Sequence, residues 1–62
     1  MPIIRVEMHK GRSEDQKRAL ARELTDAFVK TAGGTHASVQ VVLTDVEKGD
    51  WATGGELWSD KG

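Results

Sequence analysis

The chain has 62 residues, nine basic and ten acidic side chains, no cysteine and a formal charge of −1 at pH 7. This length fits a single domain over residues 1–62, and the composition excludes disulfides, thiolate metal sites and the strong basic excess typical of nucleic-acid-binding proteins. A domain below about 70–80 residues rarely gains more than ~3–5 kcal/mol from its own core, so we expect several subunits to assemble.

Residues 2–8 predict the first strand, because apolar and charged residues alternate with the period of two that a pleated strand requires. The apolar residues of one parity are Ile4, Val6 and Met8. Pro2 shares their parity, and proline is tolerated at the first position of a strand. Ile3 breaks the alternation and gives the strand apolar character on its second face as well.

A short loop over residues 9–12 leads to a helix that we expect to start at Ser13. Ser13 and Gln16 have the spacing of a capping box, in which each side chain accepts a hydrogen bond from the other residue's backbone N–H. Apolar residues then recur at helical spacing, with Leu20, Leu24 and Phe28 as the main stripe. Residues 33–34, both glycine, predict the end of the helix.

Residues 38–44 are rich in β-branched residues and predict a second strand. A strand–helix–strand unit within one sheet implies parallel strands with a right-handed crossover. The Gly54-Gly55 pair lies between short apolar segments and predicts a tight C-terminal hairpin. Val42 lies on the opposite parity from Val41 and Leu43, so we expect another subunit to cover the second apolar face of the sheet.

The remaining features argue for a protein without metal or membrane partners. His9 and His36 lack the i, i+4 spacing of a helical metal site, and we interpret both as loop or surface residues. No apolar run approaches the roughly 20 residues that span a bilayer, and residues 1–5 lack the layout of a secretory signal. These features favour a soluble, cytoplasmic protein.

Pro2 is the residue with the clearest chemical potential. Removal of the initiator methionine before a small residue such as proline would leave a free secondary amine at the start of the chain. An α-amino group ordinarily titrates near pH ~8, and desolvation or a neighbouring cation lowers that pKa. A neutral amine near pH 7 is a competent general base. The other interpretation is that Pro2 merely begins a strand.

Four stretches together are similar to the 4-oxalocrotonate tautomerase family, in the same order and spacing and over the whole chain. They are Pro2-Ile3-Ile4, residues 11–17 (Gly-Arg-Ser-Glu-Asp-Gln-Lys), residues 38–44 (Ser-Val-Gln-Val-Val-Leu-Thr) and residues 54–57 (Gly-Gly-Glu-Leu). The resemblance implies one tautomerase domain with an α+β fold: a β-α-β subunit with a parallel two-stranded sheet and a short C-terminal hairpin. It also implies a homo-oligomer, usually a hexamer built as a trimer of dimers, whose pocket is shared between subunits.

By the same resemblance, Pro2 moves a proton within a small 2-hydroxy-dienoate or 2-oxo acid without a metal or organic cofactor, a reaction known from aromatic compound catabolism. Arg12 matches an arginine that binds a substrate carboxylate, a role that suits the guanidinium fork. Trp51 matches an aromatic residue that walls the pocket. Gln40 departs from the family pattern, which has an arginine there, so we expect poor turnover of dicarboxylates and better use of a monoacid enol.

Two other readings stay open. Relatives on the same fold are hydratases or dehalogenases of unsaturated acids, which need a carboxylate to activate water, and Glu7 and Asp50 are the available candidates. Alternatively, the chain is a non-catalytic subunit of a mixed oligomer, with Gln40 marking a lost arginine. If Met1 stays attached, the Pro2 nitrogen is an amide and cannot act as a base.

Overall fold

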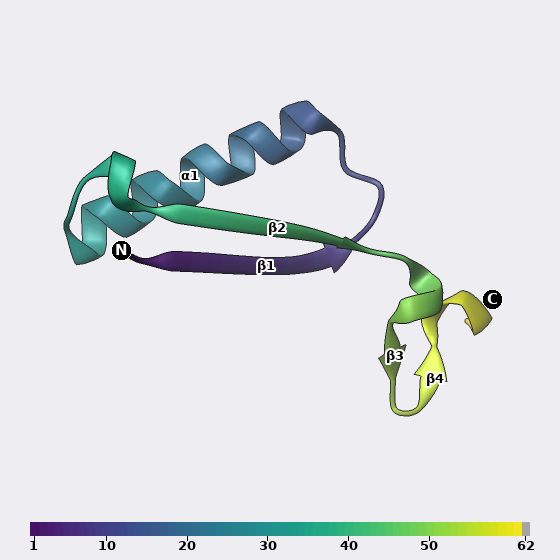
Figure 1. Cartoon of the computed structure of the whole chain (residues 1–62). Coiled ribbons are helices and arrows are strands. Elements are labelled where there is room, and N and C mark those ends of the chain that lie inside the picture. The colour runs from purple at the N-terminus through teal and green to yellow at the C-terminus, as the bar shows by residue number, and fades with distance from the viewer. Residues whose placement is uncertain (62) are drawn as a thin grey trace.

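One long helix and two parallel strands form the body of the molecule, and a small hairpin projects beyond one end of them (Figure 1). The computed structural model describes residues 1–61. The helix and strands are, in chain order, β1 (Ile3–His9), α1 (Glu14–Ala32), β2 (Gln40–Val46), β3 (Ala52–Thr53) and β4 (Glu56–Leu57). Three single 3-10 turns are η1 (His36–Ser38), η2 (Lys48–Asp50) and η3 (Trp58–Asp60). The predicted α+β fold is confirmed.

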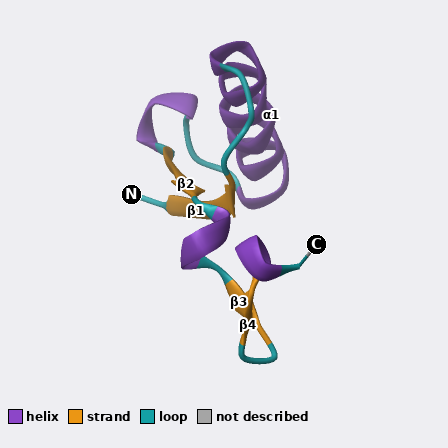
Figure 2. Cartoon of the chain, turned by 90° about the vertical axis from the view of Figure 1, so that its right-hand side faces the viewer, coloured by secondary structure: helices purple, strands orange, loops and turns teal. Residues whose placement is uncertain are grey.

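The helix covers one face of the sheet, and no other helix or strand of residues 1–61 covers the second face, which we call the uncovered face (Figure 2). β1 and β2 pair in parallel, from Ile3 opposite Gln40 to His9 opposite Val46. Along β1 the helix-side residues are half-buried or, at Met8, buried, whereas the alternate residues Ile3, Arg5 and Glu7 are exposed. The alternation read from the sequence therefore sets which residues face α1.

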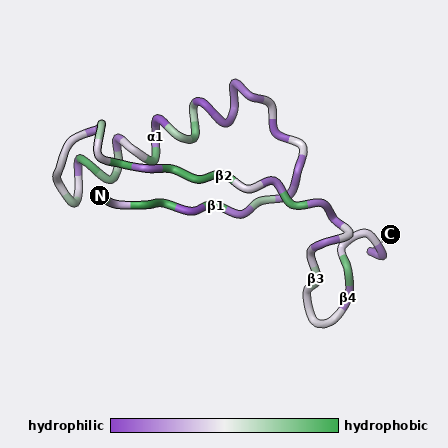
Figure 3. Tube along the Cα trace, in the orientation of Figure 1, coloured by the Kyte–Doolittle hydropathy of each residue, from purple (hydrophilic) through white to green (hydrophobic). Residues whose placement is uncertain are grey.

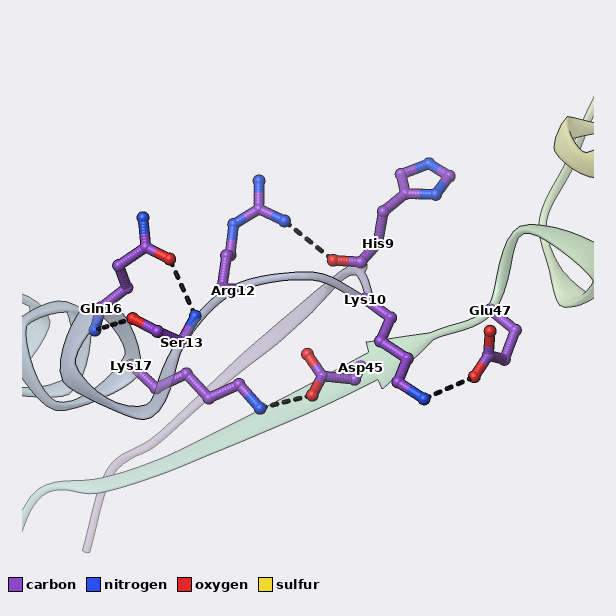
Figure 4. Close-up of polar contacts among 8 residues, drawn as sticks. All are labelled: His9, Lys10, Arg12, Ser13, Gln16, Lys17, Asp45 and Glu47. Atoms are coloured by element: carbon purple, nitrogen blue, oxygen red, sulfur yellow. Dashed lines mark hydrogen bonds and ion pairs between the residues drawn. The ribbon is translucent and has the colours of Figure 1, made fainter.

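The caps of helix α1 are the residues that the sequence predicts, although the helix itself begins at Glu14, one residue after Ser13. The Ser13 hydroxyl accepts from the Gln16 N–H at 3.2 Å, and the Gln16 side chain accepts from the Ser13 N–H at 2.8 Å (Figure 4). At the other end, Gly33 adopts φ +88° and its N–H donates to the Val29 carbonyl. An ion pair between Lys17 and Asp45 then joins the start of the helix to the end of β2.

Both strands begin and end later in the chain than the sequence predicted. β2 spans Gln40–Val46 and not residues 38–44, because Ser38 belongs to η1, where both its N–H and its hydroxyl donate to the Thr35 carbonyl. β1 extends to His9, which pairs with Val46. The prediction of His9 as a loop residue was therefore wrong, since the sheet continues one residue further than the alternation suggested.

The uncovered face of the sheet carries apolar side chains, as predicted. Ile3 is 53% exposed and Val42 is 40% exposed, and hydrophobic segments run along the first halves of β1 and β2 (Figure 3). Coverage of this face by another subunit stays a prediction. None of the helices in residues 1–61 combines the length and apolar character needed to cross a membrane.

Candidate functional site

Pro2 and Gln40 lie together at the end of the sheet where both strands begin. The Gln40 N–H donates to the Pro2 carbonyl at 2.9 Å. Pro2 directly precedes Ile3, which pairs with Gln40 at the start of the sheet. Pro2 is half-buried, and Gln40 is exposed on the face of the sheet opposite α1. The hydrogen bond between Gln40 and Pro2 fixes the start of β1. Pro2 therefore has a defined position at the edge of the uncovered face.

Arg12 lies at the opposite end, in the loop between β1 and α1. Its Nη1 donates to the carbonyl oxygen of His9 at 2.8 Å (Figure 4). Within residues 1–61, no carboxylate lies within ion-pair distance of Arg12. The guanidinium is thus held by a backbone acceptor and keeps further N–H groups for a ligand carboxylate.

Trp51 follows η2 and packs against the end of β1. Its ring stacks on the His9 imidazole with centroids 4.4 Å apart and planes inclined by 20°. Trp58 approaches the same imidazole at 4.8 Å with a tilt of 56°. No pattern in the sequence connected Trp58 with His9. The Trp58 side chain is 38% exposed, yet its ring also packs against His9 of the same chain.

A hollow of about 260 Å³ lies beside Trp51 and is lined by Glu7, Val46, Asp50, Trp51 and Ala52. Glu7 comes from the uncovered face of β1, and Asp50 from η2. In the described part of the chain neither carboxylate has an ion-pair partner. The hollow therefore brings Trp51 together with both residues that the sequence offered as activators of water.

A second hollow of about 530 Å³ lies near the loop that follows β1, and Lys10, Gly11, Glu47 and Lys48 are among its lining residues. Lys10 forms an ion pair with Glu47 at 3.0 Å (Figure 4). This hydrogen bond and the Glu47 charge raise the pKa of Lys10 above its ordinary value. Because the pair is exposed, it is a weak anchor of the loop. In residues 1–61 no group of histidine, aspartate and glutamate side chains is arranged to hold a metal ion.

The four predicted site residues fall at two separate ends of one chain. Pro2 and Gln40 lie at the start of the strands, and Arg12 and Trp51 lie beyond their far end (Figure 1). His9, which contacts both Arg12 and Trp51, follows Pro2 by seven residues of extended chain, a span of roughly 23 Å. A single chain therefore does not bring its own Pro2 to its own Arg12 or Trp51.

Similarity to a known family covers nearly all of the chain, because the family model described as tautomerase enzyme matches residues 2–61. The chain belongs to the tautomerase family. The resemblance to 4-oxalocrotonate tautomerases that the sequence suggested is confirmed by curated relatives and by solved structures.

Three relatives of this tautomerase family member show how far the similarity extends. The 2-hydroxymuconate tautomerase of Pseudomonas putida is 39% identical over 59 residues, which are 95% of this chain and 94% of that protein. A crystal structure of a 4-oxalocrotonate tautomerase homologue matches with a TM-score of 0.91 at 37% identity, covering 100% of this chain and 98% of that one. A heterohexameric 4-oxalocrotonate tautomerase from Chloroflexus aurantiacus J-10-fl matches with a TM-score of 0.89 at 32% identity, covering 97% of both. The family thus includes oligomers of this subunit type.

Proposed function

We propose that this protein interconverts the enol and keto forms of a small 2-hydroxy-dienoate or 2-oxo acid, with the Pro2 amine as base and acid after removal of Met1. The observation that best supports this is the state of Arg12. Its guanidinium donates to the His9 carbonyl at 2.8 Å, and the ring of the same His9 stacks on Trp51. Because no carboxylate of residues 1–61 pairs with it, a substrate carboxylate is its natural partner.

In the proposed reaction, the neutral Pro2 nitrogen takes the proton of the enol O–H and becomes a charged ammonium. The resulting dienolate carries its negative charge over the oxygen and the conjugated carbons. Pro2 then returns the proton to one of those carbons, which gives the conjugated ketone and the neutral amine. No metal or organic cofactor enters this scheme, which needs only a base near neutrality and donors for the developing oxyanion.

The other three residues bind the substrate and stabilise its charge. Arg12 holds the carboxylate through two parallel N–H donors, and Trp51 provides an apolar wall that limits water near the amine. Gln40 donates an amide N–H to the oxygen that gains charge. A neutral donor stabilises an anion less than a guanidinium does, so we propose a monoacid as the preferred substrate.

Such a site requires more than one chain, because Pro2 and Trp51 lie at opposite ends of the subunit. We propose that a second copy runs in the opposite direction, so that Pro2 of one chain meets Arg12 and Trp51 of another. A homohexamer built as a trimer of dimers satisfies this requirement, and a hetero-oligomer with a related chain satisfies it equally. Isologous pairing of the uncovered sheet faces would bury Ile3 and Val42 at the same time.

The test is the turnover of phenylenolpyruvate by the Pro2→Ala variant. We expect kcat/KM to fall roughly 100-fold or more, because the secondary amine of the ring is replaced by a weaker and less ordered base. The intact mass of the parent protein must first show that Met1 has been removed. N-terminal acylation of the parent should abolish turnover, and a Pro2→Ala variant as active as the parent would refute the assignment.

A second candidate function is the hydration of unsaturated or halogenated acids on the same site. It is favoured by the hollow beside Trp51, where Glu7 and Asp50 could activate a water molecule. A titration of the Pro2 nitrogen followed by NMR separates the two candidates. A mostly neutral amine at pH 7 supports tautomerisation, whereas a mostly charged one together with halide release from a 3-haloacrylate supports hydration.

A further inference from the structure

His9 contacts both of the residues assigned to substrate binding at this end of the molecule. Its ring stacks on Trp51 at 4.4 Å, and its carbonyl oxygen accepts from Arg12 at 2.8 Å. Arg12 and Trp51 are far apart in sequence and lie in different connections, Arg12 between β1 and α1 and Trp51 between η2 and β3. His9, at the end of β1, therefore links the two residues, through its ring to Trp51 and through its backbone carbonyl to Arg12.

The imidazole is itself held by ring packing. Trp58 contacts it at 4.8 Å, and the Trp58 indole N–H donates to the Thr53 hydroxyl at 2.9 Å. The Trp58 backbone N–H also donates to the Trp51 carbonyl at 2.8 Å. The His9 Nδ1 is buried and has no hydrogen-bond partner within residues 1–61. Contacts between rings, and not a bond at this nitrogen, thus orient the side chain.

We propose that His9 is a positioning residue that fixes the plane of Trp51 relative to the guanidinium of Arg12. This inference rests on the proposed function and deepens it. Trp51 lines the hollow while its ring is supported by His9, so a ligand reaches the indole without displacing the imidazole. Within the proposed site, His9 thus orients Trp51 for a flat, conjugated ligand whose carboxylate binds Arg12.

The test compares two apolar substitutions, neither smaller than His9, that differ in whether they supply a flat ring. His9→Phe keeps a ring against Trp51, and His9→Leu does not. For phenylenolpyruvate we expect His9→Leu to raise KM roughly 3- to 10-fold with kcat changed less than twofold, since the loss falls on binding and not on proton transfer. His9→Phe should keep KM within about twofold of the parent value. The near-UV circular dichroism of the indoles should change in His9→Leu and stay close to the parent in His9→Phe.

Three results would overturn the proposal: equal KM in the two variants, a loss confined to kcat, or an unchanged indole spectrum in His9→Leu. Size-exclusion chromatography should show the same assembly for both variants. If His9→Leu fails to assemble, His9→Phe is tested alone, and a raised KM in that variant overturns the proposal. The Pro2→Ala variant separates this test from that of the proposed function. If turnover does not depend on Pro2, binding of phenylpyruvate, followed by indole fluorescence, still compares His9→Leu with His9→Phe.

Discussion

At the scale of the single residue, we propose that the neutral side chain of Gln40 decides which substrates the site favours. It lies exposed on the uncovered face at the start of β2, with its backbone N–H bonded to Pro2. In the proposed site, a substrate with two carboxylates has the Arg12 cation for one carboxylate and only the neutral amide of Gln40 for the other. Such a dianion pays a larger desolvation penalty than a monoacid does, and gains less from the site.

We therefore predict that Gln40→Arg raises kcat/KM for 2-hydroxymuconate roughly 10- to 100-fold, because a charge-assisted hydrogen bond replaces a neutral one. The same assay on phenylenolpyruvate should show a much smaller change. Ala32→Arg is the matched control, since it adds the same charge at the exposed end of α1. An equal gain in both variants would show that net charge, and not the position of residue 40, governs dicarboxylate turnover.

Pro2, Arg12, Gln40 and Trp51 were selected as site residues by their register in the family pattern, and their roles stay predictions. The contact between His9 and Trp51 could not be predicted. The two residues are 42 positions apart in sequence, and alternation along one strand carries no information on what packs beside its last residue. The sequence contained only a weak indication that His9 belongs to the strand, since His9 continues the parity of Arg5 and Glu7 on the uncovered face.

At the scale of the element, helix α1 is specified locally and the second strand is not. A capping box and a glycine C-cap act over three or four residues, so the helix limits could be read from the sequence. β-Branched residues favour extended backbone without marking its first residue. Hence residues 38–39 were assigned to a strand. In the structure, Ser38 donates to the Thr35 carbonyl and is the last residue of η1, and Val39 donates to the His36 carbonyl and caps that turn.

The capping box should contribute measurably to stability. We predict that Ser13→Ala lowers the free energy of unfolding by about 1 kcal/mol, because the Gln16 N–H loses its side-chain acceptor. Ser59→Ala is the matched control, since residues 1–61 offer the Ser59 side chain no hydrogen bond. Urea denaturation at equal protein concentrations checks this, because subunit association adds to the measured stability. Equal losses in both variants would contradict a specific role for the cap.

At the scale of the whole molecule, one chain is too extended to be a complete globular unit. Its radius of gyration is 14.7 Å, whereas a compact domain of 62 residues has about 10.6 Å. Met8 is the sole buried hydrophobic residue in the described chain, and one face of the sheet has no cover. The hairpin beyond β2 contributes much of this length (Figure 1). The expectation of assembly, drawn first from chain length, thus has a geometric basis.

The site proposed above, shared between two chains that run in opposite directions, makes a quantitative prediction for mixed oligomers. Pro2→Ala and Arg12→Ala should each show little activity alone. If every site takes Pro2 and Arg12 from different chains, an equimolar mixture unfolded and refolded together should regain about a quarter of the parent activity, since half the sites receive an intact Pro2 and half of those an intact Arg12. Separately refolded variants, combined afterwards, are the control and should give only the mean of the two. Native mass spectrometry must show mixed assemblies, and mixed assemblies without recovered activity would mean that both residues of a site come from one chain.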